Sequence, residues 1–353
     1  MSSSTPNKVW LLIDSLTYGG IDAYVVELAK GLKQHRVDVE VLLLKRFERV
    51  SPIVDKLEGY NIKFSYLSYS NSFPLLTLLK RVNQRSGDIL HAHGYKASLL
   101  AKCARLCTGI TQISTYHAGE TPKGKVKLYD FIDRYTAFVS SASLAVSDHV
   151  SAKIPTKTHK LNNFIDTSKI LPSQGEQIAF VGRLSHEKAP DQFIQCAKHS
   201  PKLKFHIYGS GPMEADILQN MPNNVICHGH QKEMNNVWEK IKILIICSRF
   251  EGLPMAALEA MARGCIVIAY EVGDLPKLIE HGKNGFIVNN LETLGNTLQS
   301  ATQISEEEKK AIQKQASDTI YKHFSTSAVI PKMLNIYSGE YMQSDSQFDK
   351  KPS

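Results

Sequence analysis

Short apolar runs alternate with amphipathic stretches along most of this chain, and this alternation restricts its fold more than any other feature. The first run, Val9 to Ile13, is followed by a helical pattern from Ile21 to Gln34. Further strand-like runs occur at 37–44, 62–67, 88–93, 111–117 and 143–147, with helical patterns between them at 74–85, 96–107 and 125–139. Strands that alternate with helices form a parallel sheet with helices on both faces. The first half is therefore predicted to be a doubly wound α/β domain.

A polar segment with Pro and Gly at 160–175 interrupts this rhythm as a linker would, and the alternation then starts again. Strands of the second series are expected at 177–182, 203–208, 224–228, 243–247, 265–270 and 285–289. Helices are expected near 190–199, 213–220, 234–241, 254–263 and 291–302. From 305 to 343 the chain reads as helix only. The second half is thus predicted to be another Rossmann-like domain.

The two series predict an α/β fold of two doubly wound, Rossmann-like domains, at 1–165 and 166–325. A helix at 326–343 is expected to return toward the first domain, and 344–353 is expected to be a flexible tail. The length agrees, because 353 residues exceed what one hydrophobic core usually supports. Two such domains on one linker are expected to face each other across a deep cleft lined by the carboxyl ends of both sheets.

The composition excludes a disordered or membrane-spanning chain. Apolar residues make up 42% and charged residues 22%, close to the averages of soluble globular proteins. No apolar run reaches the roughly 18 residues of a membrane-spanning helix, and the start of the chain is polar, so a cytoplasmic protein is expected. The six cysteines form no C-x-x-C pair and are interpreted as buried free thiols in a reducing compartment.

The net charge of +8 lies in the N-terminal half, where residues 1–165 hold 22 Lys and Arg against 13 Asp and Glu. This asymmetry suggests an anionic partner, either a phosphate-bearing acceptor or the surface of an anionic membrane, with peripheral contact at its cytoplasmic face. A solvated basic face without any partner is the alternative. No nucleic acid partner is expected.

The most informative segment, 248–264, directly follows an apolar run and reads as a strand end, a loop and a helix. Pro254 suits a first helical turn. Gly252 and Leu253 allow backbone N–H groups and the helix dipole to converge on a phosphate. The segment therefore predicts an anion site at the start of this helix, and an ordinary capped surface helix is the alternative.

Two carboxylates flank this helix start. Glu251 precedes the helix, whereas Glu259 lies about two turns inside it, so the two side chains can reach different ends of one ligand. Two cations follow the strand at 177–182: Arg183 offers a planar fork and Lys188 a mobile point charge. Both suit a departing diphosphate whose negative charge grows in the transition state. Two solvated cations are the alternative.

Glycines follow two other strands. Gly19 and Gly20 come after the first strand and open a helix, so their amides could meet a phosphate, although the full G-x-G-x-x-G fingerprint of dehydrogenases is missing. Gly209 follows the strand at 203–208, where a glycine allows a close backbone approach to a ligand. A plain tight turn explains Gly209 equally well.

Histidines end two strands of the first domain, and His93 and His117 are candidate acceptor-side residues. His91 is expected to point away from them, and a purely structural role is the alternative for each. Lys123 and Lys125 in the following loop are candidate contacts to a phosphate on the acceptor. No metal is expected, because the pairs His91-x-His93 and His228-x-His230 lack further ligands at zinc spacings and no D-x-D motif occurs.

The segment with Glu251 and Glu259 resembles the E-x7-E motif of retaining glycosyltransferases of family 4, which have the two-domain GT-B fold. The segment at 180–188 resembles the G-R-L and Lys pattern of the same family, and the likeness runs from Val9 to at least Val288. Two positions depart from it. Ala189 stands where a glycine usually follows the lysine, and Lys277 stands where an acid is common.

The resemblance implies that Glu251 contacts hydroxyls of the donor sugar, that Glu259 holds ribose hydroxyls, and that Gly252 to Pro254 receive the diphosphate with Arg183 and Lys188. It places Gly209 beside the nucleotide, and Gly19 and Gly20 on the donor phosphate. It further implies that His117 contacts the transferring sugar. The catalytic candidates are therefore Glu251, His117, Arg183 and Lys188.

The expected function is transfer of a sugar from a nucleoside-diphosphate sugar to a hydroxyl acceptor with retention of configuration, without a cofactor or metal. Relatives of this kind often build cell-surface polysaccharide or lipopolysaccharide, which implies a saccharide or lipid-linked acceptor. Two alternatives remain: an epimerase of the same fold that acts on a nucleotide sugar, and a non-catalytic nucleotide-sugar-binding protein.

Overall fold

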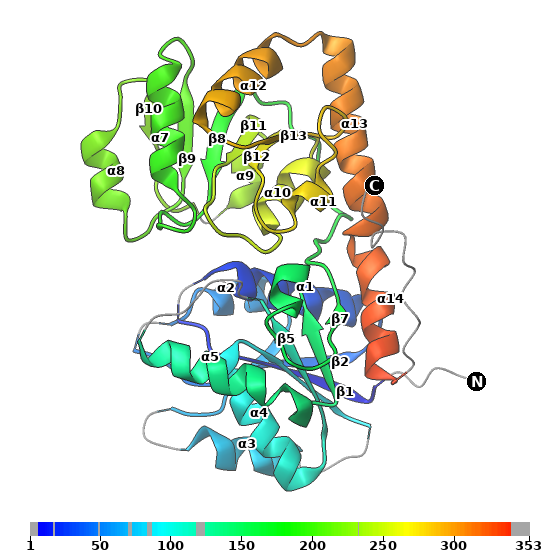
Figure 1. Cartoon of the computed structure of the whole chain (residues 1–353). Helices are drawn as coiled ribbons and strands as arrows, with labels where there is room; N and C mark the ends of the chain where they lie inside the picture. Colours follow the sequence, from blue (N-terminus) through cyan, green and yellow to red (C-terminus); the bar gives the residue numbers. More distant parts are fainter. Residues whose placement is uncertain are drawn as a thin grey trace. The chain divides into compact units, whose positions relative to one another are not determined.

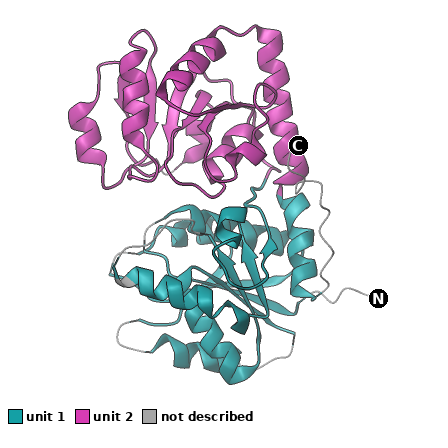
Figure 2. Cartoon of the chain, viewed as in Figure 1, with its two compact units in different colours: residues 1–166, 326–353 teal, residues 167–325 magenta. Residues whose placement is uncertain are grey.

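The computed structural model describes residues 6–16, 18–48, 50–69, 73–82, 87–117, 124–231 and 233–339. The chain divides into two compact units (Figure 2). Unit 1 comprises Met1–Asp166 and Thr326–Ser353, and unit 2 comprises Thr167–Ser325. Each unit contains a parallel sheet flanked by helices (Figure 1). The predicted doubly wound α/β class is confirmed.

The sheet of unit 1 has the strand order β3-β2-β1-β4-β5-β6-β7. Its strands are β1 (Lys8–Ile13), β2 (Asp38–Leu43), β3 (Lys63–Tyr66), β4 (Ile89–His93), β5 (Thr111–Tyr116), β6 (Ala142–Ala145) and β7 (His159–Lys160). Its helices are α1 (Gly20–Gln34), α2 (Ile53–Gly59), α3 (Pro74–Val82), α4 (Tyr95–Thr108), α5 (Lys125–Tyr135), the 3-10 helix η1 (Ala137–Val139), α6 (Asp148–Ser151) and α14 (Thr326–Tyr337).

Both faces of this sheet are buried, which explains why its strands read as continuous apolar runs. In β1, Val9, Leu11 and Ile13 lie in a core with α1, α2 and α14. Trp10 and Leu12 point to the other face and pack with α3 and α4. Successive residues of a strand alternate between the two faces. The central strand β1 is thereby enclosed, and α1 is the next element along the chain.

The sheet of unit 2 has the order β10-β9-β8-β11-β12-β13. Its strands are β8 (Gln177–Val181), β9 (Phe205–Tyr208), β10 (Val225–Cys227), β11 (Ile241–Ile246), β12 (Ile266–Tyr270) and β13 (Phe286–Val288). Its helices are α7 (Pro190–His199), α8 (Glu214–Asn220), α9 (Met234–Trp238), α10 (Met255–Ala262), α11 (Leu275–Leu278), α12 (Leu291–Gln303) and α13 (Glu306–His323).

The core of unit 2 fixes the positions of its central strands and of the loops that follow them. Phe180 of β8, Phe205 of β9 and Ile243 of β11 pack with Phe193 of α7 and Leu298 of α12 on one face. Helices α10 and α13 pack against each other, and both contact β12. The strands β8 and β11 are parallel neighbours in the middle of the sheet. The loops that follow them therefore start side by side.

The structure differs from the sequence-based expectations in a few places. The segment 305–343, expected to be helical throughout, contains a break: α13 ends at His323 and α14 begins at Thr326. At this break the Thr326 N–H donates to the Ile165 carbonyl oxygen at 3.0 Å. The helix expected at 125–139 ends at Tyr135 and continues as η1. The two-residue strand β7 and the short helix α2 were not expected, because elements of this length carry little periodicity.

The cysteines also differ in part from the expectation. All six are free thiols, but Cys103 and Cys107 are exposed. Both lie on α4, outside the buried helix face that Ala97, Ala101 and Ala104 turn toward the sheet. The expectation that all six are buried was therefore wrong, because the 3.6-residue period of α4 turns these two positions to solvent.

Candidate active site

The strand order of unit 2 reverses between β8 and β11. Doubly wound sheets bind their ligands at such a reversal, outside the carboxyl ends of the strands. The segments 182–189 and 247–254 leave β8 and β11 at this point, and the register pairs Ile178 with Ile243. These segments hold Arg183, Lys188 and Glu251, three of the four charged residues singled out for the donor site; the fourth, Glu259, follows on α10.

An ion pair joins the two segments. Lys188 Nζ lies 2.6 Å from Glu251 Oε1, and the Ser248 hydroxyl donates to the same oxygen at 2.7 Å. The Glu251 side chain is 6% exposed and that of Lys188 is 30% exposed. The structure therefore brings together two of the predicted catalytic residues, although 63 positions separate them. Arg183, by contrast, is exposed on its loop.

A second ion pair, not anticipated from the sequence, fastens the same two segments. The Arg249 guanidinium donates to both oxygens of Asp191, at 2.9 and 2.5 Å, and to the His186 carbonyl oxygen at 2.9 Å. The backbone N–H of Arg249 donates to the Glu187 carbonyl oxygen at 2.8 Å. Burial alone would raise the pKa of Asp191, but the bonds from Arg249 hold that pKa below its ordinary value. Two ion pairs, Lys188–Glu251 and Arg249–Asp191, thus hold the loop that carries Glu251.

Glu259 lies on α10, and its carboxylate accepts a hydrogen bond from the indole N–H of Trp238. Trp238 is buried at the end of α9. Arg263, one helical turn further along α10, lies 4.0 Å from Glu259 Oε2 and donates to Asn235 Oδ1 at 2.9 Å. The sequence identified Glu259 but not Trp238, whose position depends on the pairing of α9 with α10.

Helix α10 begins at Met255, with Pro254 as its N-cap in an extended conformation. The first N–H groups of a helix have no partner within the helix, and the helix dipole makes this end attractive to anions. Gly252 and Leu253 precede it directly. The backbone groups of Gly252 and Leu253 therefore lie between Glu251 and the start of α10. Their contact with a diphosphate stays a prediction.

Two glycines of unit 2 are required by close backbone approaches. Gly209 has φ +147°, and a Cβ there would lie 1.8 Å from the Gly182 carbonyl oxygen. Gly273 has φ +58°, and its Cβ would lie 2.4 Å from the carbonyl oxygens of Glu251 and Gly252. Gly209 thus serves the contact between the ends of β8 and β9, which accounts for it without a ligand. Its predicted contact with a nucleotide stays a prediction.

Ala189 stands where the resembling family usually has glycine, and it has φ +52° and ψ +53° as the N-cap of α7. An L-residue in this left-handed region costs about 1–2 kcal/mol, because its Cβ crowds the following carbonyl group. Ala189 is buried, and its carbonyl oxygen accepts a hydrogen bond from the Cys247 thiol at 3.3 Å. Lys277, the other departure, pairs with Asp274 Oδ1 at 3.5 Å.

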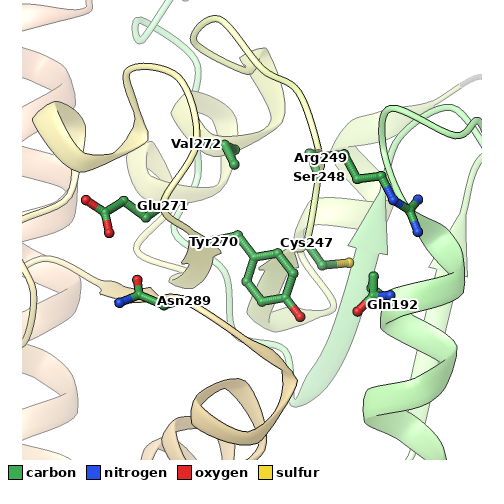
Figure 3. A pocket seen from close by; sticks show the side chains of 8 residues that line it. All are labelled: Gln192, Cys247, Ser248, Arg249, Tyr270, Glu271, Val272 and Asn289. Atoms are coloured by element: carbon green, nitrogen blue, oxygen red, sulfur yellow. The ribbon is translucent and has the colours of Figure 1, made fainter.

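A pocket of about 420 Å³ adjoins these loops at the carboxyl ends of β11, β12 and β13 (Figure 3). Figure 3 shows the Tyr270 ring between Gln192 and Arg249 on one side and Glu271 and Asn289 on the other. The Tyr270 hydroxyl is buried, and burial raises the pKa of Tyr270 to about 12. Ser248 contributes both to this pocket and to the hydrogen bond with Glu251.

In unit 1, Gly19 is the N-cap of α1 and Gly20 is its first residue. A Cβ at Gly20 would meet nothing within 4 Å, and a Cβ at Gly19 would meet only Asp22 Oδ2, at 3.7 Å. The Gly19 N–H donates to this oxygen at 2.9 Å, and the Ser15 hydroxyl donates to the other oxygen of Asp22. Burial raises the pKa of Asp22 to about 6. Contacts within the protein therefore do not require either glycine, which leaves space above the start of α1.

The histidines of unit 1 form a cluster at the ends of β4 and β5. His93 Nδ1 lies 3.1 Å from His117 Nε2, and the rings of His91 and His93 are 4.3 Å apart. His91 also contacts the Tyr337 hydroxyl at 2.7 Å and the Thr115 hydroxyl at 2.6 Å. The expectation that His91 points away was wrong, because residues two apart in a strand lie on the same face.

One of the two remaining acceptor-side candidates lies at the start of α5. Lys123 is outside the described residues, and Lys125 is the first residue of α5, with its side chain also outside them. Within the described ranges, no group of three His, Cys, Asp or Glu side chains is arranged to hold a metal ion. None of the helices in the described part of the chain is long and apolar enough to cross a membrane.

Comparison with known proteins agrees with this architecture. Residues 18–169 match the family model described as Glycosyltransferase Family 4, and residues 175–303 match the model described as Glycosyl transferases group 1. A curated relative, the UDP-Gal:alpha-D-GlcNAc-diphosphoundecaprenol alpha-1,3-galactosyltransferase of Escherichia coli, is 23% identical over 74% of this chain and 78% of its own.

The poly(ribitol-phosphate) alpha-N-acetylglucosaminyltransferase of Staphylococcus aureus is 25% identical over 52% of this chain, and the match spans 38% of that longer protein. The crystal structure of Anabaena HepE in complex with UDP-glucose superposes with a TM-score of 0.83. It is 17% identical, and the match covers 94% of this chain and 99% of HepE. Two family models on successive halves of the chain, with two parallel Rossmann-like sheets, identify it as a glycosyltransferase of the family 4 type with the GT-B fold.

Proposed function

We propose that this glycosyltransferase transfers a hexose-type sugar from a nucleoside-diphosphate sugar to a hydroxyl acceptor with retention of anomeric configuration. The observation that carries the proposal is the 2.6 Å ion pair between Lys188 and Glu251 at the switch point of unit 2. A cation and an acid are held there beside the start of α10. This arrangement offers positive charge to a diphosphate and a hydrogen-bond acceptor to sugar hydroxyls.

In the proposed reaction, the bond between the anomeric carbon and the diphosphate oxygen breaks, and its electron pair stays on the diphosphate. Arg183, Lys188 and the backbone groups at Gly252 and Leu253 stabilise this growing charge. The acceptor oxygen forms the new bond to the anomeric carbon on the same face. Its proton passes to an oxygen of the leaving phosphate, so no side chain needs to act as the base. No metal takes part in this proposal.

The two units take different roles in the proposal. Unit 2 binds the nucleotide sugar: Glu251 contacts sugar hydroxyls, Glu259 holds the ribose, and Gly209 lies beside the nucleotide. Unit 1 binds the acceptor, with Lys123 and Lys125 as candidate contacts to its phosphate. Gly19 and Gly20 approach the donor phosphate, a role supported by the open space at their Cα atoms. His117 contacts the transferring sugar, and His93 lies behind it.

The acceptor is proposed to be a saccharide or a lipid-linked saccharide of cell-surface polysaccharide or lipopolysaccharide biosynthesis. The support comes from the relatives: the Escherichia coli galactosyltransferase is named for a diphosphoundecaprenol-linked acceptor, and another relative for O-antigen biosynthesis. HepE has been crystallised with UDP-glucose, which makes UDP-sugars the first donors to test.

The first test removes the proposed ribose contact. Glu259→Ala is expected to weaken binding of UDP or GDP by about ten- to a hundredfold, because hydrogen bonds to a charged group contribute about 1.5–3 kcal/mol. Binding would be measured by titration calorimetry. Glu307→Ala, an exposed acid on α13, is the matched control and should leave the affinity unchanged.

A panel of nucleotide sugars then separates the candidate activities. A transferase slowly hydrolyses its donor to the nucleoside diphosphate and free sugar and is stabilised thermally by it. An epimerase converts the sugar without releasing nucleoside diphosphate, and an inert binder is stabilised without turnover. Unchanged affinity in Glu259→Ala would remove the ribose assignment, and absence of turnover with every donor and acceptor would remove the transferase proposal.

We further propose that α5 mediates peripheral contact of unit 1 with an anionic membrane. Helix α5 and the following η1 expose large apolar side chains to solvent, namely Val126, Leu128, Tyr129, Phe131, Ile132, Tyr135 and Phe138. Leu128 is 60% and Phe131 53% exposed. Large exposed apolar patches mark interaction sites, and an apolar helix face on a basic unit suits a lipid interface.

Vesicle binding tests this contact. The double variant Leu128→Ser with Phe131→Ser is expected to lower partition onto anionic vesicles by about four- to fifteenfold per residue, because the exposed half of such a side chain contributes about half of the 1.5–3 kcal/mol gained on complete burial. Leu218→Ser, at a leucine of α8 in unit 2 that is 50% exposed, is the control. Partition would be followed by vesicle sedimentation. Equal partition of the double variant and the native protein would show that α5 is not the contact.

A further inference from the structure

The interior of unit 1 holds a group of neutral rings behind His117. His93 Nδ1 is 3.1 Å from His117 Nε2. The buried Tyr24 of α1 packs against both, with ring centroids 5.6 Å from His93 and 4.8 Å from His117. His91 and Phe164 complete the surroundings of these rings. His93 is 1% exposed, so it does not meet a substrate directly.

The contact between His93 and His117 is a hydrogen bond between two ring nitrogens. Burial lowers the pKa of His117 to about 3, and burial together with His91 and His117 holds that of His93 well below its ordinary value. Both rings are therefore neutral at physiological pH, and each carries a single N–H. The 3.1 Å contact needs one donor and one acceptor, so the tautomer of one ring determines the tautomer of the other.

The other nitrogen of His93 distinguishes the two arrangements. His93 Nε2 is buried and has no hydrogen-bond partner. If His117 donated, this nitrogen would carry a buried N–H without an acceptor. If His93 donates through Nδ1, the nitrogen keeps only a lone pair. Buried N–H groups without an acceptor are rarer than acceptors without a donor, because desolvating a donor that forms no bond is costly.

We infer that His93 is a positioning residue: its Nδ1–H donates to His117 Nε2 and thereby fixes His117 in the tautomer with the proton on Nδ1. The free nitrogen of His117 is then a donor, and the substrate atom that meets it must be an acceptor oxygen. The importance of this donor for catalysis rests on the proposed contact between His117 and the transferring sugar. The tautomer itself does not depend on that function.

Nitrogen-15 NMR of the histidine side chains in the full-length protein tests the inference, because protonated and bare ring nitrogens have different shifts. His117, assigned with His117→Ala, is expected to show its proton on Nδ1. In His93→Phe, which keeps a ring but no nitrogen, this preference should be lost. In His93→Asn, whose amide N–H can replace the Nδ1 donor, it should be retained. Tyr24→Phe is the packing control, because the Tyr24 hydroxyl is buried without a partner.

The catalytic consequence is measured separately. His93→Phe is expected to lower kcat/KM for the donor by about five- to tenfold, the usual effect of losing one aligned neutral hydrogen bond, and His93→Asn should restore most of it. A proton on Nε2 of His117 in the native protein would overturn the inference, and so would an unchanged His117 spectrum in His93→Phe. A correct tautomer in a protein that turns over no donor would refute the proposed function alone.

Discussion

Replacing Lys188 by alanine is expected to lower kcat by about two to three orders of magnitude, with a much smaller change in KM for the donor. The cation is proposed to act on charge that develops as the diphosphate leaves, and removing one preorganised group of this kind costs about 2.7–4 kcal/mol in the transition state. Steady-state release of nucleoside diphosphate would give both constants. Lys283→Ala, at an exposed lysine paired with Glu280 in the same unit, is the matched control.

A double-mutant cycle separates this role from a structural one, because Lys188 also holds Glu251 at 2.6 Å. Glu251→Gln keeps a side chain that can accept from the Ser248 hydroxyl but removes the ion pair. If Lys188 only fixed Glu251, the double variant would be no slower than Glu251→Gln alone. We expect it to be slower than either single variant. Activity of Lys188→Ala within tenfold of the native enzyme would contradict the proposed role.

The fold class and the positions of the candidate residues were predictable from local patterns, because each β-strand and helix has its own period. The helix at 190–199, for example, was expected at the bounds that the structure has for α7. The contacts between distant segments were not predictable. Arg249 meets Asp191 because β8 and β11 are neighbours in the sheet, and strand order leaves no mark on the residues themselves.

The same reason explains why Trp238 was missed as the partner of Glu259, since the contact depends on how α9 packs beside α10. Ala189 shows a different limit. Its left-handed backbone was not expected at a residue with a Cβ, and only the glycine usual at this position of the family indicated it. The position of His91 beside His93, by contrast, follows from strand geometry alone, because residues two apart in a strand lie on the same face.

Replacing Lys102 by methionine is expected to destabilise unit 1 by about 3–5 kcal/mol, the usual cost of breaking a buried ion pair by removing one partner. Lys102 Nζ of α4 lies 2.6 Å from Asp133 Oδ1 of α5, and both side chains are 4% exposed. Among the described side chains of α5, Asp133 is the one that is buried. The pair therefore attaches a helix whose apolar residues face solvent, and losing it should free α5.

Adding Asp133→Leu to Lys102→Met shows whether the stability of unit 1 depends on the charges of this pair or on the packing of its side chains. Burial lowers the pKa of Lys102 and raises the pKa of Asp133, so the protein interior favours the neutral form of each partner. Lys102→Met with Asp133→Leu should therefore recover most or all of the lost stability. The Asp133 carbonyl oxygen keeps the Tyr116 hydroxyl as a donor at 3.2 Å. Lys127→Met, at an exposed lysine of α5, is the control for loss of a charge.

A chain with two units need not unfold in a single transition, so the stability of α5 is best measured locally. Hydrogen exchange of the α5 amides gives this local stability. The effect should also depend on pH. Without Lys102, the buried Asp133 has a folded pKa above its unfolded value of about 4, so folding favours the protonated acid. Stability is then lost as pH rises from the unfolded pKa to the folded one, and the single variant should lose more protection at pH 8 than at pH 5. Equal protection at both values, or a double variant as unprotected as the single one, would show that α5 is held by contacts other than this ion pair.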